Sequence, residues 1–162
     1  MGAMPSMLGL TEEQKLVVAD RSIAGFGITG KIAPQMLVAA GERFSNWVNE
    51  KFPNAKWFTE FPVSGQRVAG GSWRGAIDLV LALADGTLVV IDHKSAPIRR
   101  AVCEAKSLTY IGQLRAYEEV LTSRCETVST SFIHFPFAGT VVELATALSS
   151  TGRMRLGSLC DR

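Results

Sequence analysis

The chain has 162 residues, a length typical of one globular domain. Its 47% hydrophobic and 20% charged residues exclude an intrinsically disordered chain, and no apolar run is long enough for a membrane-spanning helix. Seventeen basic against fifteen acidic residues give a net charge of +2, so any surface that binds a polyanion must be local. Three widely spaced cysteines form no disulfide framework or metal motif, which favours a reducing, cytoplasmic location.

The N-terminal part is expected to be helical. Residues 1–4 read as an expression scar, and 11–20 can form a short helix with Thr11 as its N-cap. Several glycines indicate a loop over 21–33. A longer helix is predicted over 34–50, because proline suits its first position and apolar residues recur at helical spacing. These residues are Met36, Leu37, Ala40, Phe44, Trp47 and Val48.

Strands are predicted next, over 57–63, 74–83 and 87–94. The last two flank Ala84-Asp85-Gly86, a strong hairpin signal, and both their faces are largely apolar, as in a sheet covered on each side.

A second long helix is predicted over 104–123, with an apolar stripe, and strands over 128–135 and 140–144. The tail after residue 149 shows no period. The order α-β-β-β-α-β-β predicts an α/β domain with a mixed central sheet flanked by helices. The stripe comprises Leu108, Ile111, Leu114, Tyr117, Val120 and Leu121.

The hairpin carries the most informative residues. Alternation places Asp92 and Lys94 on one face of their strand. A two-residue turn would set Asp78 opposite His93, whereas a three-residue turn sets Asp78 opposite Asp92. The sequence allows both. We favour the longer turn, because glycine suits its third position and because it gathers three charged side chains at one place.

Two carboxylates about 5 Å apart on a covered sheet repel each other, and burial disfavours both charges. A divalent cation such as Mg²⁺ removes this cost, since it prefers oxygen ligands. Lys94 could then stabilise negative charge during attack of water on a phosphodiester. The alternative is a structural ion pair between Lys94 and Asp92, with Asp78 capping a loop. On spacing alone the two interpretations are balanced.

Gln113 and Tyr117 are four residues apart and share a face of the second long helix. A glutamine on a core-facing stripe needs hydrogen-bond partners, which could be a phosphate or Lys94. A border position half in solvent is the alternative.

These segments together resemble a known family. Gly75-Ala76-Ile77-Asp78, Val90-Ile91-Asp92-His93-Lys94-Ser95 and Gln113-Leu114-Arg115-Ala116-Tyr117 are similar to consecutive motifs of the PD-(D/E)XK nuclease superfamily. The nearest resemblance is to the nuclease domain of UvrD-like helicase–nucleases, as in the exonuclease V beta subunit and AddA-type subunits. Glu60-Phe61-Pro62-Val63 and Ile133-His134-Phe135-Pro136 resemble flanking segments, so the likeness spans roughly residues 30–145.

The resemblance implies a restriction-endonuclease-like core and cleavage of DNA that depends on Mg²⁺ or Mn²⁺. It implies that Asp78 and Asp92 bind metal, together with the main-chain carbonyl of His93, and that Lys94 is the catalytic lysine. Gln113 and Tyr117 then correspond to the helix motif beside the site. The side chain of His93 should point to the opposite face.

One departure concerns a further ligand, often a histidine, that relatives supply from the helix before the strands. The helix at 34–50 has none. Glu42 or Glu60 could replace it, it could be lost, or it could lie upstream; Glu60 could equally be a solvated edge residue. His134, on a short aromatic strand, is expected to be a packed, hydrogen-bonded histidine.

Several basic residues surround the motifs and could meet DNA phosphates, with Arg99 and Arg100 the preferred candidates and ordinary solvated charge the alternative. No sequence-reading motif is seen, so cleavage should depend little on base sequence. The cysteines do not support an iron–sulfur cluster. The other basic candidates are Arg67, Arg74, Lys106 and Arg115.

The sequence thus predicts an expression scar at 1–4, an N-terminal extension at 5–33, a nuclease domain at 34–148 and a C-terminal tail at 149–162. The expected function is that of a metal-dependent exonuclease module of a DNA helicase in recombinational repair, acting on single-stranded ends. The alternatives are a non-catalytic DNA-binding or docking module of the same fold and a stand-alone nuclease.

Overall fold

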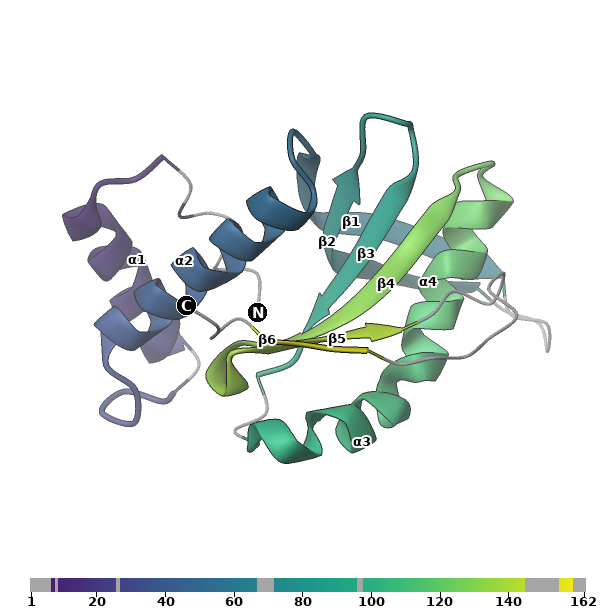
Figure 1. Ribbon diagram of the computed structural model, residues 1–162. Coiled ribbons are helices and arrows are strands. Elements are labelled where there is room, and N and C mark those ends of the chain that lie inside the picture. Colours follow the sequence, from purple (N-terminus) through teal and green to yellow (C-terminus); the bar gives the residue numbers. More distant parts are fainter. Residues whose placement is uncertain are drawn as a thin grey trace.

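The computed structural model describes residues 7, 9–25, 27–66, 72–95, 98–144 and 155–158. Its centre is a six-stranded sheet whose strands lie side by side in chain order (Figure 1). Strands β3 and β4 run parallel and every other neighbouring pair is antiparallel, so the predicted mixed α/β sheet is confirmed. The strands are β1 (Lys56–Gln66), β2 (Ser72–Ala82), β3 (Leu88–His93), β4 (Val128–Phe135), β5 (Thr140–Leu144) and β6 (Arg155–Ser158).

Helices cover both faces of the sheet. Helix α2 (Pro34–Lys51) packs on one face and α4 (Ile111–Ser123) on the other (Figure 1). Phe44 and Val48 of α2 are fully buried against one apolar cluster, and Leu114 and Leu121 of α4 are buried against a second. The two-sided burial explains why β3 is buried at every position.

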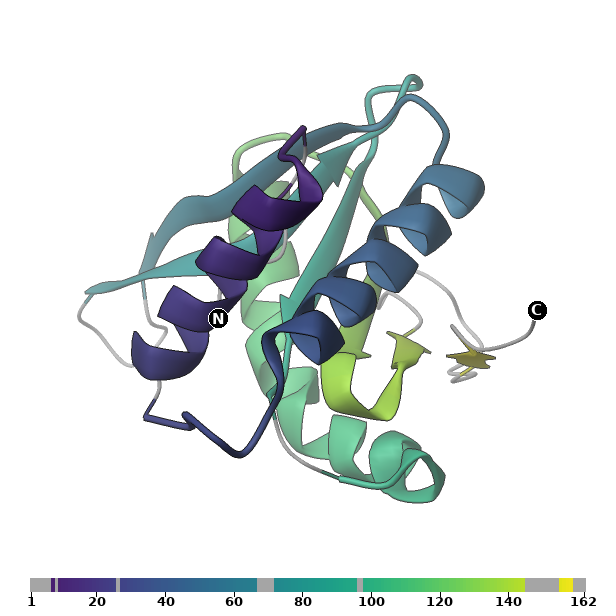
Figure 2. The ribbon, with the colours of Figure 1, turned by 90° about the vertical axis from the view of Figure 1, so that its left-hand side faces the viewer.

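Helix α1 (Glu12–Gly25) lies against α2 on the outer side (Figure 2). Thr11 caps it as predicted: the backbone N–H of Gln14 donates to Thr11 Oγ1 at 3.3 Å, and the backbone N–H of Thr11 donates to Gln14 Oε1 at 2.9 Å. The helix runs on to Gly25, where a loop was predicted, because Ile23 is buried in the cluster between α1 and α2.

The prediction of one continuous helix over 104–123 is wrong. This part of the chain is divided into a 3₁₀ turn (Arg100–Val102), helix α3 (Cys103–Ser107), a second 3₁₀ turn (Leu108–Tyr110) and α4. Leu108 is 54% exposed, so it does not belong to the apolar stripe. In α3 the buried residues are Cys103 and Ser107. The buried side of α4 is formed by a separate set, Leu114, Tyr117, Val120 and Leu121. Met36 of α2 is likewise exposed rather than part of the core.

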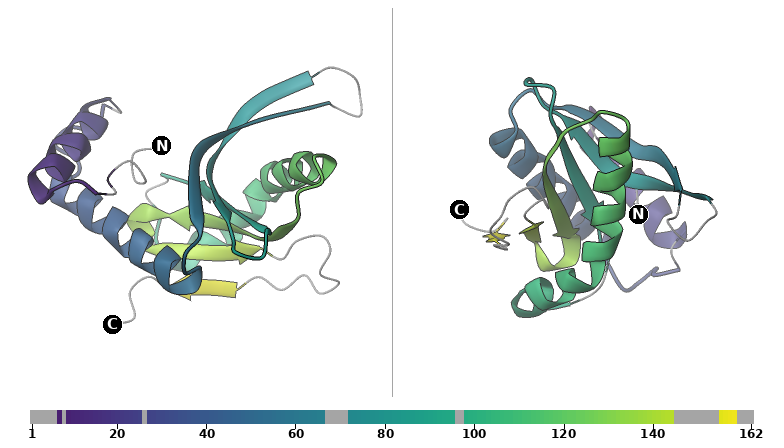
Figure 3. Two further views of the ribbon diagram at one scale, coloured as in Figure 1. Left: turned by 90° about the horizontal axis from the view of Figure 1, so that it is seen from above. Right: turned by 90° about the vertical axis from the view of Figure 1, so that its right-hand side faces the viewer.

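The β1–β2 ribbon curves strongly across the molecule (Figure 3). Glu60 lies in its bend with φ +49°, a conformation that non-glycine residues rarely adopt in a strand. Pairing of Thr59 with Leu79 and of Phe61 with Ile77 places Glu60 opposite Asp78. Leu79 packs with the cluster under α2, but Ile77, which alternation would put beside it, packs with the cluster under α4. The ribbon therefore turns over at Asp78.

Strand β6 was not predicted. It pairs antiparallel with β5 within the tail that lacks a hydrophobic period, while residues 149–154 and 159–162 of that tail lie outside the described residues. Within the described part of the chain, no helix combines the length and apolar character needed to cross a membrane.

Candidate active site

The β2–β3 turn has three residues, which confirms the favoured register. The backbone N–H of Leu83 donates to the Thr87 carbonyl at 2.9 Å, and Gly86 has φ +82°. Leu79 pairs with Ile91, so continuing the register sets Asp78 opposite Asp92. The backbone N–H of His93 donates to Asp78 Oδ2 at 2.7 Å, which ties the first carboxylate to the end of β3.

Asp92 is the buried carboxylate of the site, with 1% of its surface exposed. Lys94 Nζ lies 2.6 Å from its Oδ2, and Gln113 Nε2 donates to its Oδ1 at 3.1 Å. Burial raises the pKa of Asp92, and the Asp78 charge raises it further, while the Lys94 ammonium acts in the opposite direction. Keeping Asp92 ionised therefore depends on nearby positive charge.

Gln113 connects the two sides of the site. Lys94 Nζ donates to Gln113 Oε1 at 2.9 Å, and Gln113 Nε2 also contacts the Tyr117 hydroxyl at 2.6 Å. That hydroxyl donates to the Ala76 carbonyl at 3.3 Å, which joins α4 to β2. Gln113 is exposed, so the border position and the Lys94 contact, weighed as alternatives from sequence, are both realised.

Tyr110 belongs to the same site and was not singled out from sequence. Lys94 Nζ lies 4.5 Å from its ring centroid, and Lys106 Nζ lies 5.6 Å from it. The ring thus holds two ammonium groups by cation–π attraction. The spacing of Tyr110, Gln113 and Tyr117 along the helical segment is the signal that could have found it, since i, i+3 and i+7 share a face.

The other predicted site residues lie at varied positions. Arg99 and Arg100 are exposed at the start of the helical segment after β3. Glu60 is exposed, with its backbone opposite Asp78. Glu42 faces α1, where its carboxylate pairs with Lys15 at 2.6 Å. Within the described residues, no three histidine, cysteine, aspartate or glutamate side chains are grouped so as to hold a metal ion.

The side chains of His93 and His134 lie on the face opposite to Asp92, as alternation predicted for His93. Their Nδ1 atoms are 2.9 Å apart, so one ring donates and the other accepts. The ring of Phe44 stacks on His134 with centroids 4.2 Å apart. Both Nε2 atoms are buried without a partner among the described residues. His134 is therefore the packed, hydrogen-bonded histidine that was expected.

This pair predicts an acid-sensitive fold. Burial lowers the pKa of His93 from its ordinary 6.5 to about 4 and lowers the pKa of His134 well below its ordinary value. At a pH between the ordinary pKa and the lowered pKa of a histidine, the unfolded chain binds more protons than the folded protein. The free energy of unfolding therefore falls as pH falls, by up to about 1.4 kcal/mol per pH unit for each histidine. The raised pKa of Asp92 partly opposes this loss, because the folded state then takes up a proton.

Urea denaturation from pH 7 to pH 4.5 measures the effect. The control is His93→Leu/His134→Leu, which should show a much flatter profile over the same range. An equal slope in the parent and in the double variant would contradict the assignment.

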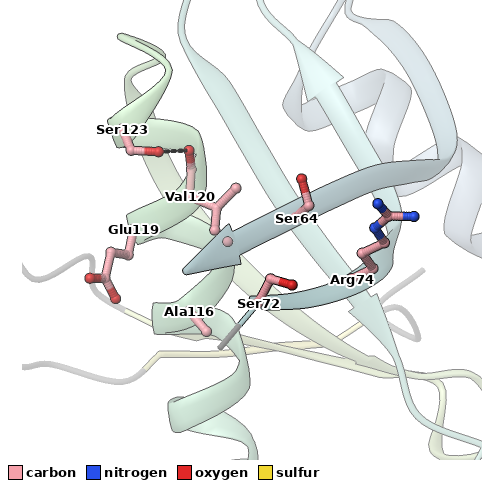
Figure 4. Close-up of a pocket in the computed structure, with 8 residues that line it drawn as sticks. Ser64, Ser72, Arg74, Ala116, Glu119, Val120 and Ser123 are labelled. Carbon is pink, nitrogen blue, oxygen red and sulfur yellow. Dashed lines mark hydrogen bonds between the residues drawn. The ribbon is translucent and has the colours of Figure 1, made fainter. Parts of the chain in front are cut away.

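A groove of about 550 Å³ lies next to the site, between the far part of the β1–β2 ribbon and α4 (Figure 4). Ala116 in its wall adjoins Tyr117, and Ser64 and Ser72 line the ribbon side. The lining contains one arginine, Arg74, and one glutamate, Glu119, so its formal charges cancel. The groove is polar but does not by its charge favour a polyanion.

Asp78 and Asp92 are the side chains of this site that could hold a small hard cation. Of the two carboxylates from neighbouring strands, Asp92 pairs with the Lys94 ammonium, whereas Asp78 accepts from the backbone N–H of His93. One ammonium group is therefore set against two acidic side chains. The carboxylate that is most buried also has the raised pKa, so an added cation would relieve the largest cost. Oxygen donors of this kind suit Mg²⁺ or Mn²⁺.

Comparisons with known proteins add no family assignment. Neither the models of protein families nor the curated proteins give a match to this chain.

Proposed function

We propose that this domain is a metal-dependent nuclease that hydrolyses phosphodiester bonds in DNA. The observation that carries the proposal is the convergence of Asp78, Asp92, Lys94 and Gln113 at one place, from β2, β3, the residues after β3 and α4. An acid pair, a lysine and an amide on one side of a mixed sheet match the motifs on which the resemblance to the PD-(D/E)XK nucleases rests. A restriction-endonuclease-like core is part of the same proposal.

Asp78 and Asp92 would hold Mg²⁺ or Mn²⁺, with the main-chain carbonyl of His93 as a further oxygen donor. When bound, the ion supplies charge neutralisation at the phosphate. With that ion as the counter-charge of Asp92, the Lys94 ammonium would be available to stabilise negative charge on the phosphate oxygens. Gln113 and the ring of Tyr110 keep the ammonium close, because they contact it independently of Asp92.

We further propose, from the resemblance, that the domain works as an exonuclease module beside a DNA helicase in recombinational repair. Single-stranded ends delivered by the helicase would be its substrate. Arg99 and Arg100, both exposed at the start of the helical segment after β3, would contact the phosphates. Glu60 remains a candidate for an additional metal ligand, because the bend places its backbone opposite Asp78.

A second candidate function is a nuclease-fold module that binds DNA or a helicase without cutting. The observation in its favour is that Asp92 already has protein partners: its Oδ1 accepts from Gln113 at 3.1 Å, and its Oδ2, which accepts no hydrogen bond, lies 2.6 Å from the Lys94 ammonium. An ion pair and a hydrogen bond of this kind can serve structure alone.

Calorimetric titration of Mg²⁺ and Mn²⁺, combined with a cleavage assay on single- and double-stranded oligonucleotides, separates the two functions. We expect metal binding and metal-dependent cleavage. Absence of both binding heat and cleavage would overturn the nuclease proposal and support the docking function.

A further inference from the structure

A stripe of four side chains leads from the exposed helical segment to the candidate site. Arg99, Val102, Lys106 and Tyr110 are separated by three, four and four residues. Residues three apart overlie one another across a 3₁₀ turn and residues four apart do so in an α-helix, so this spacing sets the four roughly in one row along the segment formed by the 3₁₀ turn at Arg100–Val102, α3 and the second 3₁₀ turn. Lys106 Nζ lies 5.6 Å from the Tyr110 ring, which confirms the alignment over the last step. The other cation at that ring is Lys94, at 4.5 Å, so the stripe ends at the proposed catalytic lysine.

The stripe is open to solvent where it leaves the site. Cys103 and Ser107 are fully buried and fix which side of α3 faces the protein. Val102 is 48% exposed, between exposed Arg99 and exposed Lys106. This part of the surface therefore offers a ligand an apolar contact at Val102 and positive charge on either side of it.

We propose that this stripe binds an unpaired nucleic-acid strand and leads it to Lys94. The inference rests on the proposed nuclease function and extends it by naming the strand's binding surface. Arg99 and Lys106 contact successive phosphates, while a base packs on Val102. Tyr110 forms the last step, because its ring lies beside both Lys106 and Lys94.

An unpaired strand fits this surface better than a duplex. The faces of its bases are open, so Val102 can pack against one of them, whereas stacking hides those faces in double-stranded DNA. The neighbouring flank carries Arg100, Glu104 and Leu108 four residues apart, so an acidic side chain lies there between the cation and the exposed aliphatic group.

Leu108 supplies a matched control. It is as exposed as Val102, 54% against 48%, but lies about a third of a turn away around the helix axis. The experiment measures binding of a fluorescent single-stranded oligonucleotide by anisotropy, with EDTA present to prevent cleavage. We expect Val102→Ser to weaken binding about fivefold, from the loss of apolar contact, and Leu108→Ser to leave it unchanged. Binding of a duplex of equal length should respond to neither change.

Charge gives a second, independent readout. Lys106→Gln should weaken single-strand binding and reduce the slope of log affinity against log salt concentration by about 0.7, the value for one lost phosphate contact. Lys56→Gln, which removes an exposed lysine at the start of β1, should change neither quantity.

Three results would overturn the inference: failure of the parent protein to bind the single strand, equal effects of Val102→Ser and Leu108→Ser, and equal weakening of duplex binding. None of them depends on cleavage. A parent that cuts DNA with metal while the Val102 variant binds normally would leave the proposed function standing and remove only the binding stripe.

Discussion

Asp92→Asn is expected to reduce metal-dependent DNA cleavage by about a thousandfold or more, because it removes the charge of the buried carboxylate through which the ion would be held. The amide keeps the size of the side chain and can still contact Gln113. The free energy of unfolding should change by less than about 1 kcal/mol, since the lost ion pair is offset by removal of a charge from the interior. Initial cleavage rates at saturating Mg²⁺ and urea denaturation measure the two effects.

The control for this variant is Asp20→Asn, which neutralises an exposed acid of α1 far from the site. It should cut DNA at the parental rate. A parental rate in Asp92→Asn itself would show that this carboxylate does not carry the reaction, and the site would have to be abandoned.

Lys94→Met is expected to reduce cleavage by at least about a hundredfold and to lower the free energy of unfolding by about 2 kcal/mol. Methionine retains the apolar stem but leaves the Asp92 carboxylate buried beside Gln113 alone. The stability loss is smaller than for a fully buried pair, because the Lys94 side chain is 19% exposed.

The double variant Asp92→Asn/Lys94→Met separates the two effects of the lysine. With both charges gone, we expect most of the lost stability to return while the variant stays inactive. Urea denaturation of the parent, the two single variants and the double variant gives the coupling free energy. If Lys94→Met alone is as stable as the parent, the ion pair has no structural role, and if it cuts at the parental rate, Lys94 is not catalytic.

Local sequence signals predicted the central part of the site. The three-residue turn followed from a glycine placed where the backbone is left-handed, and this turn alone sets Asp78 opposite Asp92. Strand alternation correctly put the His93 side chain on the other face. Each of these predictions depends on residues close together in the chain, where period and turn chemistry are sufficient.

Other features depended on distant contacts. The break at Leu108–Tyr110 could not be read from the apolar stripe, because Leu108 fits the helical period and yet its side chain is 54% exposed. The bend at Glu60 has no signal in a strand-like segment, and it arises where the β1–β2 ribbon passes from one apolar cluster to the other. Strand β6 forms because β5 offers an edge for pairing, although its own sequence shows no period.

The sequence by itself determined the mixed α/β class and limited the hairpin to two registers, of which the structure has the one favoured by glycine at the third turn position. Only the tertiary structure decided that Tyr110 and Gln113 close around the Lys94 ammonium, and that the stripe from Arg99 ends there. Period and turn chemistry act over a few residues, whereas the contact between β3 and the segment that begins α4 requires the chain to fold back over the sheet.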